Sequence, residues 1–260
     1  QGVTSSSAAM LSFVPKVVGF TALLRLLPVC FGSAGFADWM PVGAVRIVLI
    51  VLAILTMFVG NLMALRQTSI MRLLAYSSIA HAGYMLVGLT VGNSSTGTSG
   101  VASLLFYLSM YGIMTIGLFA LITAAGSFAR PLRSLTDLAG LSRSHPAIAL
   151  MMAICLIGLS GLPPTGGFLA KLNLFLAAWS EGTADGRLLA ITLAINAVIA
   201  ATYYLRMISA MYFEQSTDVR GASRQPAAWI AGCVCSVATL ALFMVPQPLW
   251  DAAFYALSHR

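Results

Sequence analysis

The sequence predicts an all-α polytopic membrane protein with about seven transmembrane helices, one of them broken at Pro163-Pro164. Of its 260 residues, 59% are hydrophobic and only 8% are charged, with a mean hydropathy of +0.92; an average soluble domain has about 25% charged residues. Apolar segments of about 20 residues, long enough to cross a hydrocarbon core, alternate with polar loops. We therefore treat residues 1–260 as a single membrane domain.

Seven apolar segments account for the predicted spans. They cover residues 8–27, 42–65, 70–91, 101–125, 145–179, 188–213 and 227–245. The third is unusually polar, carrying serines and tyrosines besides Arg72 and His81; a helix of that kind should be surrounded by other helices rather than by lipid. The seventh is closed by Pro246 and Pro248, because proline lacks the donor that would continue a helix.

Residues 126–145 form a polar connector whose leucines and arginines predict a short helix lying at the membrane interface. Arginines gather in alternate loops. One side holds Arg66, Arg130, Arg133, Arg143, Arg220 and Arg224, with Arg72 just inside the third span. The other side holds Arg46, Arg187 and Arg260, with Arg25 near the end of the first span. Positive loops face the cytoplasm or matrix, so the net charge of +7 indicates orientation and no nucleic-acid partner.

The segment 145–179 is longer than one crossing needs and is interrupted halfway. The interruption consists of Pro163, Pro164, Gly166 and Gly167. Proline removes a donor and clashes with the preceding turn, so the helix must break there. A break at membrane depth is tolerated only inside protein or beside a water-filled cavity. Lys171 follows the break closely. A charged side chain costs free energy at this depth of the membrane, and a residue of this kind is by default a functional candidate. The segment therefore predicts part of an ion or proton path.

Lys16 and Lys171 are the only lysines among 14 basic residues, and both lie in apolar segments. Arginine stays charged in proteins, whereas a buried lysine can give up its proton. Together with His81 they predict a buried polar chain. Alternatives stay open: Lys16 can snorkel to the interface, His81 can be a hydrogen-bonded packing residue, Arg72 favours an interfacial anchor, and Tyr84 is more typical of an interhelical hydrogen bond.

The sequence shows no phosphate-binding loop, no catalytic-triad spacing and no metal-ligand cluster. Cys233 and Cys235 lack a second ligand pair, so neither a metal site nor a disulfide is favoured. Any catalysis by this chain is therefore expected to be transport.

Several stretches carry a resemblance to a known family. GNLMALRQTSIMRLLAYSSIAHAGYMLVGL resembles the signature of the antiporter-like subunits of respiratory complex I, the NADH:quinone oxidoreductase. DLAGLSRSHPAIAL followed by LSGLPPTGGFLAKLNLF is similar to the subunit N branch, called subunit 2 in mitochondria. The opening QGVTSSSAAMLSFVPKVVGFTALLRLL and the late ATYYLRMISAMYF also match that branch. The similarity covers nearly the whole chain.

The resemblance implies a fold of fourteen helices built from two inverted repeats, each with one broken helix, a symmetry common in transporters. The present chain looks like the second half, with Lys16 on the central helix, His81 on the third span and Lys171 in the outer half-channel. It implies that these groups relay protons, coupled to quinone reduction elsewhere in the complex. It also implies that this chain holds no redox cofactor, and that NAD, FMN, Fe-S clusters and quinone belong to other subunits.

Two departures from the family pattern matter. Relatives commonly have a lysine where this chain has Met71, so either Arg72 substitutes in part or that step is dispensable. The first half's glutamate and lysine pair is absent, so we expect a separate polypeptide to supply the upstream helices; a shortened chain is the competing explanation. Other expected partners are membrane-arm subunits and lipids. A divided subunit favours the mitochondrial inner membrane over a bacterial plasma membrane.

Three other functions stay open. One is a subunit of a multisubunit cation/proton antiporter with the same lysines, although the RSHP and LPPTGGF motifs argue against it. Another is a structural membrane-arm subunit that does not pump, which Met71 keeps open. The third is an unrelated solute transporter, which predicts a substrate-sized cavity near the break.

Overall fold

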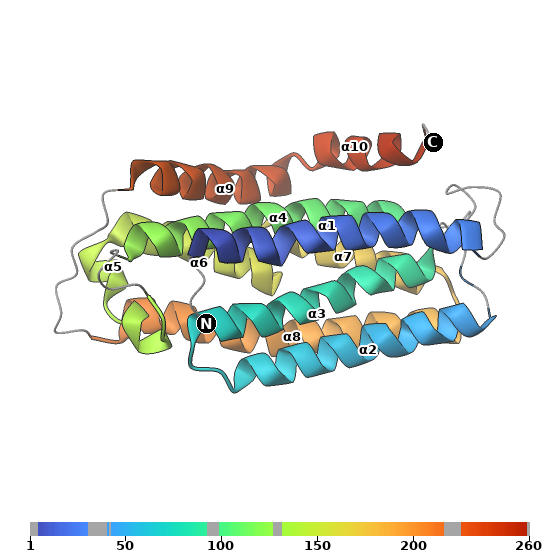
Figure 1. Cartoon of the computed structure of the whole chain (residues 1–260), viewed down its shortest axis with the longest axis horizontal. Helices are drawn as coiled ribbons and strands as arrows, with labels where there is room; N and C mark the ends of the chain where they lie inside the picture. Colours follow the sequence, from blue (N-terminus) through green and yellow to red (C-terminus); the bar gives the residue numbers. More distant parts are fainter. Residues whose placement is uncertain are drawn as a thin grey trace.

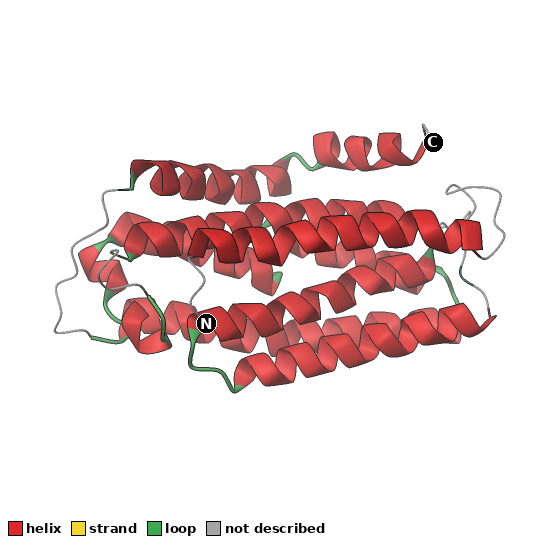
Figure 2. Cartoon of the chain, in the orientation of Figure 1, coloured by secondary structure: helices red, strands yellow, loops and turns green. Residues whose placement is uncertain are grey.

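The computed structural model describes residues 5–30, 41, 43–92, 99–126, 132–215 and 225–258. Figure 2 shows helices joined by loops. The elements are α1 (Ser5–Cys30), α2 (Gly43–Leu65), α3 (Ile70–Val91), α4 (Gly100–Ala125), η1 (Leu135–Leu138), α5 (Leu141–Ser144), α6 (Pro146–Ser160), α7 (Gly166–Ser180), α8 (Ala184–Phe213), α9 (Pro226–Met244) and α10 (Gln247–Ser258). Four of the arginines used for the orientation, Arg130, Arg220, Arg224 and Arg260, lie outside the described residues.

Six of these helices, α1 to α4, α8 and α9, are long and apolar enough to cross a membrane. The half-helices α6 and α7 follow one another along the bundle and make up the remaining crossing (Figure 1). Each has 15 residues, so at about 1.5 Å per residue the pair is roughly 45 Å long. The prediction of an all-α membrane protein with about seven spans, one of them broken at Pro163-Pro164, is confirmed.

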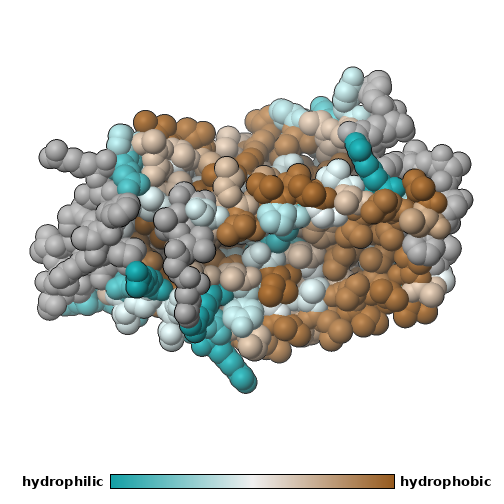
Figure 3. Space-filling view, viewed as in Figure 1, coloured by the Kyte–Doolittle hydropathy of each residue, from teal (hydrophilic) through white to brown (hydrophobic). Residues whose placement is uncertain are grey.

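The helices run along one common direction, and Figure 1 shows α3 between α1 and α2. Of the most apolar window of α4, 72% is buried, and of that of α3, 67%, against 17% for α1 and for α9. The prediction that the polar third span is surrounded by other helices is therefore confirmed. Apolar side chains cover much of the face shown in Figure 3, as expected for a surface that meets lipid tails.

Helices α2 and α3 pack tightly against each other, and glycines allow the approach. A Cβ on Gly60 would lie 2.5 Å from the backbone nitrogen of Ala80, and a Cβ on Gly83 would lie 2.8 Å from that of Met57. Small residues at helix contacts are the usual means of packing in membranes, where the hydrophobic effect between helices is weak. This contact fixes the position of α3, which carries His81.

The connector folds differently from the expected interfacial helix. Its described part forms two short turns, η1 and α5, separated by Gly140 at φ 69°. The carboxylate of Asp137 accepts hydrogen bonds from the backbone of Arg133 and Ser134, which favours a capped turn over a continuing helix. Backbone bonds from Ile70 N to Arg133 O and from Leu135 N to Thr68 O, both 2.9 Å, attach the connector to the start of α3.

The sequence does not predict α10, because the last span was expected to close at Pro246 and Pro248. Proline at the first turn of a helix removes no hydrogen bond that the helix uses, so these prolines allow a new helix to begin. Figure 1 shows α10 continuing along the bundle beyond α9. The ring of Trp250 lies 5.5 Å from that of Phe106 on α4, which holds α10 against the bundle.

Candidate functional site

The break between α6 and α7 leaves two backbone carbonyls without their usual partners. In a continuous α-helix the N–H groups of residues 163 and 164 would bond the carbonyl oxygens of Leu159 and Ser160. Both positions are proline, which has no N–H. Gly161 ends α6 in the left-handed region, at φ 80°. The two carbonyls are therefore open to another donor.

Lys171, in the second turn of α7, is that donor. Its Nζ donates to Leu159 O at 3.1 Å and to Ser160 O at 2.6 Å, and the residue is only 5% exposed. The carbonyl end of a helix carries roughly half a negative charge, so the break stabilises an ammonium by its field as well as by hydrogen bonds. A Cβ at Gly161 would lie 2.5 Å from Lys171 Cδ, so glycine is needed there for room as well as for φ.

Tyr84 on α3 provides the third contact of Lys171. Lys171 Nζ lies 5.0 Å from the centroid of its ring, within the range of a cation–π interaction. The hydroxyl of Tyr84 accepts a hydrogen bond of 3.0 Å from Asn61 Nδ2. Tyr84 is thus an interhelical hydrogen-bonding residue, which is the alternative that the sequence left open for it. It also contacts the lysine at the break.

Asn61 on α2 joins Tyr84 to α8 through a fully buried cluster. Its amide donates to Asn196 Oδ1 at 3.0 Å, and its Oδ1 accepts a hydrogen bond of 3.0 Å from the hydroxyl of Tyr203. All four side chains are buried. Sequence reasoning missed Asn61; the available signal was one amide in an otherwise apolar segment, which in a membrane indicates an interhelical partner.

His81 lies between two tyrosine hydroxyls and is 1% exposed. Its Nδ1 is 2.7 Å from the hydroxyl of Tyr107 on α4, and its Nε2 is 3.0 Å from that of Tyr204 on α8. Tyr204 is in turn hydrogen-bonded to Ser77. Neutral imidazole has one donor and one acceptor nitrogen, whereas imidazolium has two donors. Hydroxyls can serve as donor or acceptor, so this site accommodates the neutral and the protonated ring.

Lys16 on α1 completes the line of polar side chains on the other side of His81. The ring centroid of Tyr111 is 4.9 Å from that of His81, and Lys16 Nζ lies 3.9 Å from the Tyr111 centroid. Lys16 Nζ is buried and has no hydrogen-bond partner among the described residues. The amine therefore points into the bundle and not towards a polar interface. We call the series Lys171, Tyr84, His81, Tyr111 and Lys16 the polar row.

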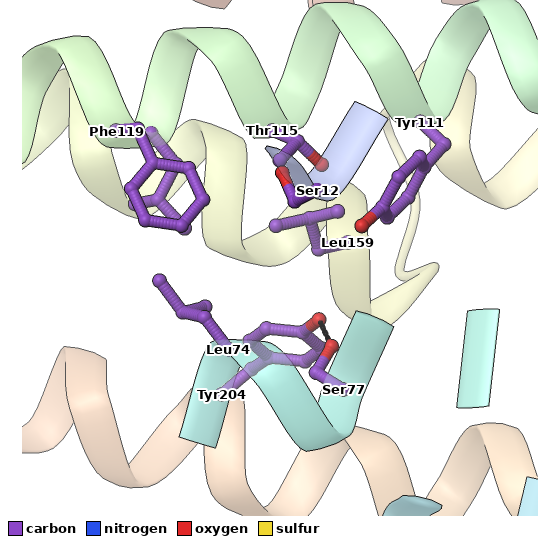
Figure 4. A pocket seen from close by; sticks show the side chains of 9 residues that line it. Ser12, Leu74, Ser77, Tyr111, Thr115, Phe119, Leu159 and Tyr204 are labelled. Carbon is purple, nitrogen blue, oxygen red and sulfur yellow. Dashed lines mark hydrogen bonds between the residues drawn. The ribbon is translucent and has the colours of Figure 1, made fainter. Parts of the chain in front are cut away.

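A small cavity lies beside the polar row (Figure 4). Its volume is about 10 Å³, close to the least that holds one water molecule. It is lined by Ser12, Leu74, Ser77, Tyr111, Thr115, Leu118, Phe119, Leu159 and Tyr204. Figure 4 shows the hydroxyls of Ser12, Tyr111 and Thr115 on one side and those of Ser77 and Tyr204 on the other. Thr115 Oγ1 is buried without a hydrogen-bond partner among the described residues, as expected where water completes the bonding.

Arg72 does not join the polar row. It is exposed in the first turn of α3, and Met71 beside it is half-buried. This position fits an interfacial anchor, the alternative to a relay function. In the described part of the chain, no group of three or more His, Cys, Asp or Glu residues could hold a metal ion.

The fold and site define an integral membrane protein of the antiporter-like type, with a broken transmembrane helix and a lysine at the break. The chain belongs to the NADH:quinone oxidoreductase/Mrp antiporter transmembrane family, whose sequence profile matches residues 1–200. The resemblance to the antiporter-like subunits of complex I is thereby confirmed.

Examples of similar proteins are one curated relative and two chains of solved structures. The chain is 45% identical over 218 residues to NADH-quinone oxidoreductase subunit N of Trichlorobacter lovleyi, covering 84% of this chain and 42% of that protein. A chain of respiratory complex I from Thermus thermophilus with bound aureothin is 33% identical, with a TM-score of 0.66 over 79% of this chain and 45% of that one. A chain of the archaeal membrane-bound sulfane sulfur reductase is 26% identical, with a TM-score of 0.79 over 96% and 48%.

The chain spans about half the length of the relatives it matches. These relatives are bacterial or archaeal, so they do not support the preference for a mitochondrial membrane. Membrane location itself follows from the family and from the apolar helices.

Proposed function

We propose that this chain is a proton-translocating membrane-arm subunit of an NADH:quinone oxidoreductase, which relays protons through Lys171, His81 and Lys16 and is coupled to quinone reduction elsewhere in the complex. The observation that carries the proposal is Lys171, whose ammonium is held by the two carbonyls that Pro163 and Pro164 leave free. Lysine can exist there with or without its proton, whereas arginine could only hold the charge.

The middle of the relay is His81. A proton that reaches one imidazole nitrogen from a tyrosine hydroxyl allows the other nitrogen to release one to the opposite hydroxyl. Tyr204 and Ser77 continue the hydrogen-bonded chain to the small cavity, which both of them line. Water in that cavity would extend the relay to Tyr111, whose ring faces Lys16. The amine of Lys16 has no hydrogen-bond partner among the described residues.

The two lysines act on His81 through their charges, because Tyr84 lies between His81 and Lys171 and Tyr111 lies between His81 and Lys16. A charge on either lysine disfavours a second positive charge on the imidazole. The release of a proton by one lysine therefore favours the arrival of a proton at His81, which couples the protonation of the three groups.

The proposal assigns the redox chemistry to other chains. NAD, FMN, Fe-S clusters and quinone would bind to other subunits of the complex, and this chain would hold none of them. Its partners would be other membrane-arm subunits, lipids and a polypeptide that supplies the upstream helices. Helix α1 carries Lys16, yet only 17% of its most apolar window is buried within this chain. This low burial supports a partner beside α1.

The test is the substitution Lys171→Met in the assembled complex. Methionine keeps an unbranched side chain and removes the titratable amine. We expect NADH oxidation to continue while fewer protons are translocated per NADH, measured in vesicles that contain the purified complex. Leu172→Met, at the half-buried neighbour on α7, is the matched control and should pump normally. Full pumping by Lys171→Met would contradict the proposal.

A second candidate is a subunit of an Mrp-type cation/proton antiporter, because the matched family includes both. The identity of 45% to a subunit N favours the first candidate. Purification of the native complex discriminates between them: NADH dehydrogenase subunits should accompany this chain in the first case and antiporter subunits in the second. An unrelated solute transporter is disfavoured by the match to the NADH:quinone oxidoreductase/Mrp antiporter family.

A further inference from the structure

An ion-pair cluster lies at the end of the bundle towards which α7 runs. Arg46 in the first turn of α2, Glu181 directly after α7 and Asp185 in the first turn of α8 meet there. Arg46 Nη2 is 2.6 Å from Glu181 Oε1, and Arg46 Nε is 3.4 Å from Asp185 Oδ2. None of these residues belongs to the polar row. Glu181 nevertheless follows the same helix as one member of the polar row, because α7 also carries Lys171, about 15 Å away along the helix axis.

The two carboxylates of the cluster differ in their surroundings. The side chain of Glu181 is 5% exposed and that of Asp185 is 54% exposed. Glu181 Oε2 is buried and has no hydrogen-bond partner among the described residues. It faces Gly186, whose N–H is already bonded to Thr183 Oγ1 at 3.0 Å. A buried carboxylate oxygen without a donor is destabilised, and a proton on it removes part of that cost.

Arg46 does not depend on Glu181 alone for a partner. The exposed Asp185 already gives Arg46 a partner, and Thr183 Oγ1 gives it another at 3.4 Å. Because Asp185 also contacts Arg46, protonation of Glu181 would leave Arg46 with a carboxylate partner. The cluster therefore tolerates Glu181 with and without a proton, which an isolated buried pair would not.

From this geometry we propose that Glu181 is the outer proton-exchange group of the chain. The inference rests on the proposed function of Lys171. The ammonium of Lys171 loses one proton and becomes an amine, and Glu181 Oε2 gains one through water that enters between them. Water at the end of the bundle then takes that proton, and Glu181 returns to a carboxylate beside Arg46. The buried hydroxyls of Thr90 on α3 and Ser103 on α4 lie on two of the helices that pack against α7.

The test compares three variants of the assembled complex in vesicles. Glu181→Gln keeps the shape of the side chain and an acceptor for Arg46 but cannot carry the proton. Asp185→Asn makes the same charge change at the exposed partner of the same arginine and is the matched control. Lys171→Met sets the size of the loss expected when this subunit transfers no protons. We expect Glu181→Gln to lose as many protons per NADH as Lys171→Met, and Asp185→Asn to lose none.

Normal pumping by Glu181→Gln, or an equal loss in Asp185→Asn, would overturn the function of Glu181. Normal pumping by Lys171→Met would instead contradict the proposed function itself. If Glu181→Gln does not assemble, the wild-type complex can be labelled instead with dicyclohexylcarbodiimide, which reacts with protonated carboxyl groups in apolar surroundings. Mass spectrometry should find the adduct on Glu181 during turnover, and its absence there would overturn the inference.

Discussion

The two lysines of this chain both lie in apolar helices, but their surroundings differ. Lys171 donates to two backbone carbonyls at the end of α6 and faces the ring of Tyr84. Lys16 faces the ring of Tyr111, and its buried amine has no hydrogen-bond partner among the described residues. One lysine therefore has acceptors that are fixed by the backbone, and the other depends on a π face and on water.

This difference suggests a division of labour along the polar row. Fixed acceptors and a helix dipole stabilise the protonated form of Lys171, so this site is suited to hold a charge. A buried amine without such acceptors favours the neutral form, so Lys16 is suited to receive a proton and pass it on. His81, which accommodates both protonation states, lies between them. The following predictions test whether the two sites differ in this way.

The largest effect is expected from Lys171→Arg. Guanidinium can donate to the carbonyls of Leu159 and Ser160, but it does not release its proton. We expect the complex to assemble with near-normal thermal stability, and proton translocation through this subunit to be lost. The measurement is protons per NADH in vesicles, alongside the midpoint temperature of the purified complex. Wild-type pumping by this variant would show that Lys171 acts only through its charge.

The next effect is expected from Gly161→Ala. Any residue with a Cβ in the left-handed region is destabilised by about 1–2 kcal/mol. At Gly161 the added methyl would also displace Lys171, since it would lie 2.5 Å from Cδ, and overpacking of this kind costs about 1–3 kcal/mol more. Gly182→Ala is the matched control: its φ is 74°, and nothing lies within 4 Å of the added Cβ.

Both glycine variants should lower the midpoint temperature, but only Gly161→Ala should also lower pumping. Equal losses of stability, with pumping intact in both, would show that the contact between Gly161 and Lys171 has no functional consequence.

The stability of the two lysine-to-methionine variants sharpens the comparison directly. Lys171→Met leaves the Leu159 and Ser160 carbonyls buried without a donor, which should lower the free energy of unfolding by about 2 kcal/mol. Lys16→Met removes a buried amine that lacks a hydrogen-bond partner among the described residues, so it should leave that free energy unchanged or raise it. Thermal unfolding of the purified complexes measures both. The reverse order would mean that Lys16, and not Lys171, is the better-stabilised ammonium.

The sequence predicts the part of this site that depends on local chemistry. Consecutive prolines identify the break, and Lys171 follows in the same apolar segment. Both features can be found from the sequence because they lie within one span. The partners of these residues come from distant helices and leave no local trace: Tyr107 and Tyr111 could not be told from packing tyrosines. Arg46 and Glu181 are 135 residues apart in the sequence, and no local pattern pairs them.

The ends of the elements show the same limit. Pro246 and Pro248 were read as the end of the last span, although proline also starts helices, and α10 begins there. Arg206, which donates to Leu65 O at 3.0 Å and so caps α2, was not assigned to a side at all. In each case the residue type was visible, and the decisive contact came from another helix.

The smallest effect is expected at Tyr84, where two substitutions separate the ring from the hydroxyl. Tyr84→Phe keeps the π face for Lys171 and loses the hydrogen bond from Asn61, so it should cost about 1 kcal/mol of stability and leave pumping nearly normal. Tyr84→Leu also removes the cation–π contact, worth about 0.5–2 kcal/mol, and should slow proton transfer as well. Because Lys171 retains its two carbonyl acceptors in both variants, the loss at Tyr84→Leu should be smaller than the loss at Tyr111→Leu, where Lys16 has no such acceptor. Equal losses at the two tyrosines would show that the carbonyls at the break do not distinguish Lys171 from Lys16.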